Sequence, residues 1–293
     1  MTGRDQTNVE QKRPRTNPRM WLVGFAVLAL VVIAYWDTFR TLWLTWQTNA
    51  NYSHGTLIPP IAAFVFWAER KRISGRASGG SLWALVAIVL ALGVHVLSIR
   101  AGVFMTQGYS FVLLVAGVIA LFLGGRALRA AWFPVSYLIF ILPMPPVLMS
   151  EVSFRLKVFA ARAGSALAIK LGIPLARVGM TIHMPAGSLR IADPCSGLRS
   201  LIALIALGAL FGYFSRGPVW KRLALFLSAI PIAVAANIVR ITLLCVVANV
   251  WGIEAALGFF HDVSGVLIFV LALVGLFVVQ RLLRMPHEAG EAS

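Results

Sequence analysis

The sequence predicts an all-α polytopic membrane protein, from its composition, the length of its apolar runs and the placement of its positive charges. Of 293 residues, 59% are hydrophobic and only 12% are charged. Apolar runs recur that reach the roughly 17–25 residues a helix needs to cross a bilayer. Lipid tolerates only helices and closed barrels, and these runs are too long and continuous for barrel strands. We therefore expect about eight transmembrane helices.

The expected spans are joined by short loops, except after the fifth. They cover residues 20–36, 56–69, 81–99, 104–123, 130–148, 195–214, 222–249 and 262–280. The first run lacks a convincing small-residue cleavage site, so we interpret it as a retained anchor rather than a removed signal peptide. Residues 1–19 and 285–293 are polar and lack an apolar face. We expect disordered cytoplasmic tails there, on either side of a transmembrane domain at 20–284.

The net charge is +16, but the positive residues lie in short loops between apolar runs. Their placement is therefore interpreted as a signal of membrane orientation rather than of nucleic-acid binding. No nucleic-acid-binding module is recognisable. The five scattered histidines form no metal-ligand motif, so we expect neither a metal nor another cofactor. Most Lys and Arg fall on one side, which places both termini in the cytoplasm. These residues lie in the N-terminal tail and at 70–76, 126–129, 216–222 and 281–284.

A long segment on the opposite, outer side separates the fifth and sixth spans. Its positive charges conflict with the topology, but long segments translocate with less regard to charge. Residues 150–172 have apolar positions at helical spacing, which predicts an amphipathic helix at the outer interface. A membrane-spanning helix would bury Arg155, Lys157 and Arg162 at high cost. Alternating apolar residues on both sides of "PAGS" then predict a β-hairpin that leads to Cys195.

Cys195 lies where this polar segment meets the sixth apolar run. Asp193 can cap the helix and Pro194 suits its first position, which puts Cys195 in the first turn. Free backbone N–H groups and the helix dipole lower the pKa of a thiol there, although the charge of Asp193 opposes this. Three interpretations stay open for Cys195: a nucleophile, a packing residue, or half of a disulfide with Cys245. Without that disulfide, Cys245 is expected to be a packing residue.

Two further features are predicted at the depth of Cys195. Arg240 interrupts the seventh apolar run together with Asn237, which shares its helix face. If the helix starts at Arg222 on the cytoplasmic side, Arg240 lies about 27 Å further along the helix axis. This distance is close to the thickness of the hydrocarbon layer, so Arg240 is expected near the outer face. Such an arginine either snorkels to the interface or faces inward to a functional site. His261 begins the eighth span at the same level.

Three other residues qualify as supporting candidates. Besides Asn237, Arg199 lies one turn below Cys195, where it would hold the thiolate, hold a substrate carboxylate or brace the bundle. His54, in "NYSHG" on the outer side, competes with His261 as the base. Ser53 beside it is expected to cap a helix. A thiol, a positive donor and a proton-transfer group at one depth suit acyl transfer.

The ordered motifs resemble the exosortase/archaeosortase family. They are "CSGLRS" at 195–200, "ANIVR" at 236–240 and "FHDVSG" at 260–265, supported by "NYSHGTLIPPI" and the hairpin. The resemblance covers residues 45–283. It implies a multi-pass cysteine protease or transpeptidase with Cys195 as nucleophile and Arg240 and His261 as the other catalytic residues. It also implies exported substrate proteins with a C-terminal signal: a short motif such as Pro-Glu-Pro, a transmembrane helix and a basic tail.

The resemblance places such an enzyme in the bacterial inner membrane, often beside exopolysaccharide genes. The expected reaction is acyl transfer through a Cys195 thioester, resolved by water or by an acceptor amine on a lipid or glycan. The expected partners are these exported proteins and membrane lipid, with no nucleic acid. Two rivals remain: a transporter of polysaccharide precursors, and a non-enzymatic component of exopolysaccharide or envelope assembly.

Overall fold

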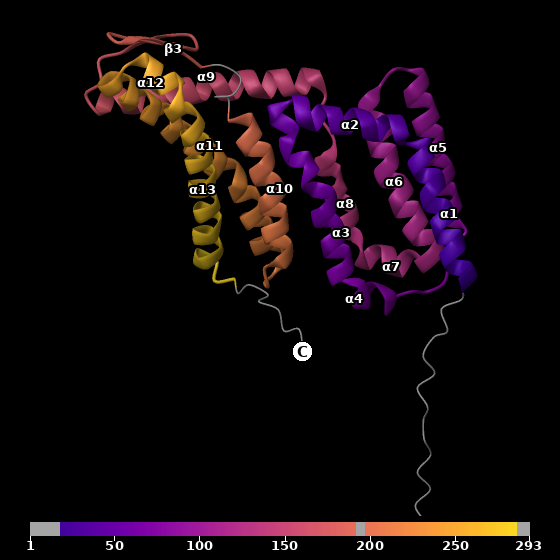
Figure 1. The fold of residues 1–293 in the computed structure, drawn as a ribbon. Helices are drawn as coiled ribbons and strands as arrows, with labels where there is room; N and C mark the ends of the chain where they lie inside the picture. The colour runs from indigo at the N-terminus through magenta and orange to yellow at the C-terminus, as the bar shows by residue number, and fades with distance from the viewer. Residues whose placement is uncertain (1–17, 192–196, 286–293) are drawn as a thin grey trace, which may run out of the picture. The chain divides into compact units, whose positions relative to one another are not determined.

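A computed structural model describes residues 18–191 and 197–285, with side chains from residue 25 onward except at 261 and 262. The chain divides into two compact units, residues 1–41 and 42–293. Figure 1 shows the course of the chain. Its elements are α1 (Pro18–Ala34), α2 (Trp36–Thr48), η1 (Ala50–Thr56), α3 (Ile58–Ala68), α4 (Arg70–Ser74), α5 (Trp83–Arg100), α6 (Phe104–Leu123), α7 (Gly125–Ala130), α8 (Trp132–Tyr137), η2 (Leu138–Ile141), α9 (Pro146–Lys170), β1 (Ala176–Val178), β2 (Thr181–Met184), β3 (Gly187–Arg190), α10 (Leu198–Phe214), α11 (Val219–Trp251), α12 (Ile253–Leu257) and α13 (Phe259–Leu282).

The fold is that of an all-α polytopic membrane protein, as predicted, but the count of eight spans is not supported. In the described chain, four helices are long and apolar enough to cross a membrane: α5, α6, α11 and the Val263–Leu282 part of α13. Counting each of two bent helix pairs as one span raises the number to six. The remaining predicted runs are helical but short or broken. The 11 residues of α3 rise only about 16 Å, half the hydrocarbon thickness.

The fifth predicted span ends early, and α9 leaves it at a sharp angle. Pro143 and Pro145 follow η2, and proline cannot continue a helix interior. The segment Trp132–Ile141 and α9 are bent by 80° relative to each other. In Figure 1, α9 runs across the ends of α10 and α11. Its charged residues Arg155 and Arg162 are exposed. This orientation agrees with the predicted interfacial helix, which stays a prediction because it depends on where the membrane lies.

The predicted hairpin is present, within a three-stranded antiparallel sheet of order β1-β2-β3. Met184 pairs with Gly187, so Pro185 and Ala186 form a two-residue turn within "PAGS". Ile182, Met184 and Leu189 point to one buried face, as strand alternation requires. The apolar alternation expected for the hairpin begins at Val178, but a turn at Gly179 and Met180 separates that residue from β2, so Val178 ends a further strand, β1, whose three residues are exposed.

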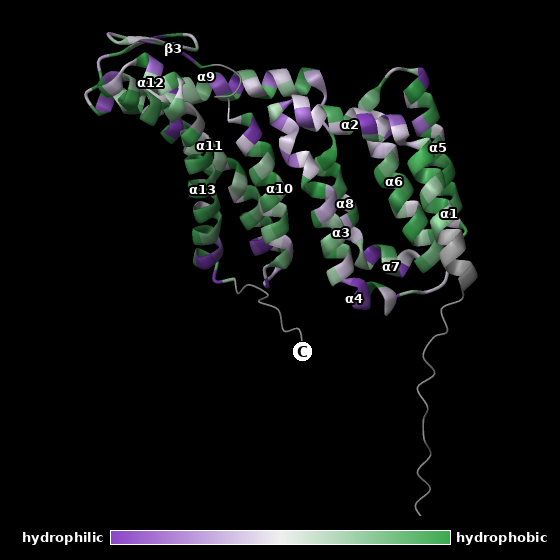
Figure 2. Cartoon of the chain, in the orientation of Figure 1, coloured by the Kyte–Doolittle hydropathy of each residue, from purple (hydrophilic) through white to green (hydrophobic). Residues whose placement is uncertain are grey.

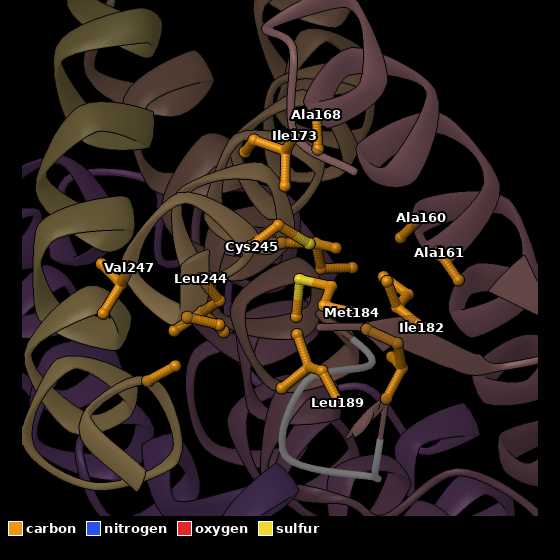
Figure 3. Packing of buried hydrophobic residues seen from close by; sticks show 14 residues of the cluster. Ala160, Ala161, Ala168, Ile173, Ile182, Met184, Leu189, Leu244, Cys245 and Val247 are labelled. Atoms are coloured by element: carbon orange, nitrogen blue, oxygen red, sulfur yellow. The ribbon is translucent and has the colours of Figure 1, made fainter. Parts of the chain in front are cut away.

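The buried face of the sheet joins a core cluster that includes Cys245. Figure 3 shows Cys245 beside Met184 and Ile173, with small residues of α9 on the other side. Cys245 is fully buried and is a free thiol. It is therefore a packing residue, and the alternative disulfide between Cys195 and Cys245 is not formed.

Positively charged segments lie together at the end of the second unit opposite the sheet. Figures 1 and 2 show α4, α7, the C-terminal end of α10 and the C-terminal end of α13 at this end. Lys221, just after the α10–α11 turn, donates a 2.8 Å hydrogen bond to the carbonyl of Leu283 after α13. This end, which we call the basic end, carries segments that the sequence assigns to the cytoplasm, and that assignment stays a prediction.

The contact of α9 with α11 depends on a small residue. A Cβ atom on Gly164 would lie 2.7 Å from Cγ2 of Ile241. We expect Gly164→Leu to lower the free energy of unfolding by about 1–3 kcal/mol, the usual cost of overpacking. Thermal unfolding in one detergent measures this. Ala166→Leu, on the exposed side of α9, is the control and should unfold like the wild type. Equal unfolding temperatures for both variants would contradict the assigned contact.

Candidate functional site

One cavity of about 480 Å³ collects the supporting residues predicted from the sequence, together with Arg240. Its walls come from η1, the start of α10, the middle of α11 and the first turns of α13. His54, Arg199, Asn237 and Arg240 all line it. These residues span almost two hundred positions of sequence, so the tertiary fold is what brings them together.

Arg240 is buried and is held from α13. Only 9% of its surface is exposed to solvent. Its Nε donates a 3.0 Å hydrogen bond to Oγ of Ser264. The cavity wall continues with Gly265, where an added Cβ would lie 3.9 Å from Nη2 of Arg240. Arg240 therefore faces the interior of the protein, which decides against the snorkelling alternative. Ser264 lies in the quoted "FHDVSG" motif, but the sequence analysis gave it no role.

The side chain of Asn237 packs directly against Gly197, the residue before α10. Gly197 precedes α10 with φ of +74°, and a Cβ on it would lie 2.7 Å from Cγ of Asn237. Only glycine combines this left-handed backbone with so close an approach. Asn237 itself is only 3% exposed. The "CSGLRS" segment is thereby fixed next to the "ANIVR" face of α11.

His54 lies in η1. Contacts with Trp46 of α2 and with the segment around η2 hold η1 in place. Nε1 of Trp46 donates to the carbonyl of Ile141 at 3.1 Å, and a Cβ on Gly55 would overlap the Trp46 indole. The hydroxyl of Tyr52 accepts a 3.0 Å hydrogen bond from the backbone N–H of Met144. The sequence analysis gave Trp46, Tyr52 and Gly55 no role.

Ser53 is not the helix cap that the sequence predicted. Asn49 caps η1, and Oγ of Ser53 donates to the carbonyl of Ala50 at 3.1 Å. The reason is that a 3₁₀ turn, rather than the expected start of an α-helix, occupies the "NYSHG" stretch.

His54 and Arg199 are coupled electrostatically across the cavity. Burial lowers the pKa of His54, and the positive charge of Arg199 lowers it further. The backbone carbonyls of Asn51 and Phe140 oppose this shift in part. Both ring nitrogens of His54 are buried, and no described group meets either of them with good hydrogen-bond geometry. A neutral imidazole in that position can accept or relay a proton.

Arg199 is the most accessible charge of the cavity. It lies in the first turn of α10 and is exposed, and the described residues offer its guanidinium no hydrogen bond or ion pair. Among the described residues it therefore braces no neighbouring helix through a hydrogen bond or ion pair. Two arginines and no acidic residue lie among the described lining, so the cavity favours an anionic group or a developing negative charge.

The remaining predicted residues are placed only in part. Cys195, with Asp193 and Pro194, lies outside the described residues. His261 is the third residue of α13, and its side chain is outside the described part of the chain. His95 is buried in α5, and His183 is exposed, with Nδ1 2.8 Å from Oγ of Ser188. Neither of them lines the cavity.

Metal chemistry finds no support in the part of the chain that is described. No group of three or more His, Cys, Asp or Glu there could hold a metal ion. The described polar lining of the cavity consists of two guanidinium groups, one imidazole, two amides and two hydroxyls, from Arg199, Arg240, His54, Asn51, Asn237, Ser53 and Ser200.

Comparison with known proteins identifies the family. No curated protein and no solved structure matches the sequence. The family model of the transmembrane exosortases matches residues 46–278, which include η1, α10, α11 and the start of α13, the four segments that build the cavity. The match covers most of the chain, and the chain therefore belongs to the transmembrane exosortase family.

Proposed function

We propose that this protein is a membrane-embedded cysteine protease or transpeptidase that removes the C-terminal sorting signal of exported proteins. The observation that carries the proposal is the cavity that His54, Arg199, Asn237 and Arg240 share directly beside Gly197. Cys195 precedes Gly197 by two residues, and two residues of chain reach at most about 7 Å. The proposal therefore requires the thiol of Cys195 to act at this positively charged cavity.

In the proposed reaction, the thiolate of Cys195 attacks the carbonyl carbon of the scissile peptide bond. A C–S bond forms, and the carbonyl oxygen takes the negative charge, which Arg240 stabilises. The C–N bond then breaks, and the leaving amine receives its proton from His261. Water or an acceptor amine on a lipid or glycan then attacks the thioester and gives a proton to His261, and the C–S bond breaks to release the Cys195 thiolate. The burial of Arg240 supports its role, because a low-dielectric site strengthens its interaction with the oxyanion.

The proposed substrate docks laterally from the bilayer, with its signal helix in the membrane and its basic tail on the cytoplasmic side. The scissile bond then lies at the outer face of the inner membrane, near Arg240. Both termini of the enzyme are cytoplasmic in this proposal, which an even number of crossings satisfies. The arginines and lysines of α4, α7, the α10–α11 turn and the end of α13 lie at one end of the second unit, away from the sheet, and support this orientation.

The first experiment tests the nucleophile. A reporter with an exported domain, a Pro-Glu-Pro-type motif, a transmembrane helix and a basic tail is co-expressed with the enzyme. We expect Cys195→Ala to abolish loss of the signal helix, measured by the intact mass of the reporter. Cys245→Ala is the matched control: it removes the buried packing thiol, and processing should persist. Normal processing by a well-expressed Cys195→Ala protein would exclude the enzymatic proposal and favour the assembly or transport alternative.

The second experiment tests Arg240 as the oxyanion donor. Lysine keeps the charge but loses the planar fork of donors. We expect Arg240→Lys to retain a little activity and Arg240→Ala to lose about 10²–10³ in kcat/KM, the effect of one oxyanion donor in a studied protease. Ser264→Ala, which removes the 3.0 Å hydrogen bond to Nε, should cost less. Wild-type kcat/KM in folded Arg240→Ala protein would remove Arg240 from the mechanism.

The third experiment separates His261 from His54 as the proton-transfer residue. We expect His261→Ala to change the pH profile and to be rescued in part by a substrate with an activated ester leaving group. Arg199→Gln supplies the counter-test, because removal of its charge raises the pKa of His54. If His54 were the base, the acid limb of kcat/KM would then move to higher pH. Loss of turnover in His54→Ala, with an unchanged profile in His261→Ala, would reverse the assignment.

A further inference from the structure

A second polar pocket lies at the basic end, away from the cavity of His54 and Arg240. It has a volume of about 300 Å³ and lies between the α3–α4 junction and the α10–α11 turn. Three arginines, Arg72, Arg216 and Arg222, line it together with one acid, Glu69. We call it the arginine pocket. Its described lining has a surplus of positive charge, so it is complementary to an anion.

An apolar groove of about 500 Å³ joins the arginine pocket. It runs between α8–η2 on one side and α10–α11 on the other, and almost all of its lining is apolar or aromatic. We call it the α8–α10 groove. Trp132, Tyr213 and Arg222 line both spaces, so the polar and apolar parts are continuous.

The junction between the two spaces is built by fixed side chains. The rings of Phe133 and Tyr213 stack at 3.9 Å, and Trp132 meets Tyr213 edge-on at 6.1 Å. Nε of Arg222 donates a 2.8 Å hydrogen bond to the carbonyl of Gly212. At the rim, Arg72 pairs with Glu69 at 2.9 Å and both side chains keep some exposure. The junction is therefore formed before any ligand arrives.

We propose that the arginine pocket and the α8–α10 groove together bind one anionic phospholipid from the leaflet at the basic end. The phosphate and headgroup occupy the arginine pocket, and an acyl chain lies along the groove. The apolar α8–α10 groove is complementary to the acyl chain of such a lipid, and the arginine pocket is complementary to its anionic headgroup. A peptide helix with a basic tail fits less well, because its tail would meet three arginines. This binding site goes beyond the proposed protease function and does not depend on it.

The headgroup is tested with the full-length protein in detergent by native mass spectrometry. Phosphatidylglycerol and phosphatidylcholine of the same chain length are added in turn. We expect preferential binding of phosphatidylglycerol, weakened about tenfold or more in Arg72→Gln/Arg216→Gln, because each basic residue contributes about 1 kcal/mol at an anionic lipid surface. Arg76→Gln/Arg126→Gln is the matched control, since these exposed arginines line neither space. Equal binding of both lipids, or equal losses in both double variants, would overturn the proposal.

The acyl chain is tested by filling the groove. Ala209 lines only the apolar part, and Ala209→Phe should weaken phosphatidylglycerol binding without removing a charge. Unchanged binding in a variant that unfolds at the wild-type temperature would show that the groove is not used. Displacement of bound phosphatidylglycerol by a transmembrane peptide with a basic tail, but not by inorganic phosphate, would identify the groove as a peptide site and overturn the lipid proposal.

Discussion

The candidate site depends on the close approach between the start of α10 and the middle of α11. Gly197 lies so near Asn237 that any side chain on Gly197 would collide with the amide. This contact helps to bring three short motifs of the chain into one place: the segment after Cys195, the polar face of α11 and the first turns of α13. Without it, Arg240 would be a buried charge beside a lipid-facing helix, which is costly.

Polar residues in the middle of α11 are tolerated because neighbouring helices supply their partners. Ser264 of α13 accepts a hydrogen bond from Arg240, and the hydroxyl of Thr242 reaches the carbonyl of Gly164 in α9 at 3.3 Å. A buried polar group without such partners would destabilise the fold. The same contacts orient Arg240 toward the cavity. Stability and the proposed chemistry therefore rest on one set of interactions.

The two ends of the second unit provide different chemical environments. The end with α9 and the sheet carries the cavity with His54 and Arg240, where burial and Arg199 keep the imidazole neutral. The basic end carries the arginine pocket, which opens into an apolar groove. In the proposed function the scissile bond lies at the first end, and in the lipid proposal the headgroup lies at the second.

Local patterns in the chain were sufficient for the helical membrane class, a helix after the fifth apolar run and the hairpin. They also singled out His54, Arg199, Asn237 and Arg240, which the fold brings to one cavity and whose roles stay predictions. Apolar periodicity and isolated polar residues in apolar runs are local signals, so they can be recognised without a fold. The number of spans could not be predicted in this way, because whether α3 or α8 crosses a membrane depends on bends and on neighbouring helices. Ser264, Gly197, Tyr52 and Trp46 were missed for the same reason. Their roles come from partners distant in sequence, and only packing of the helices reveals which small or polar residue meets which.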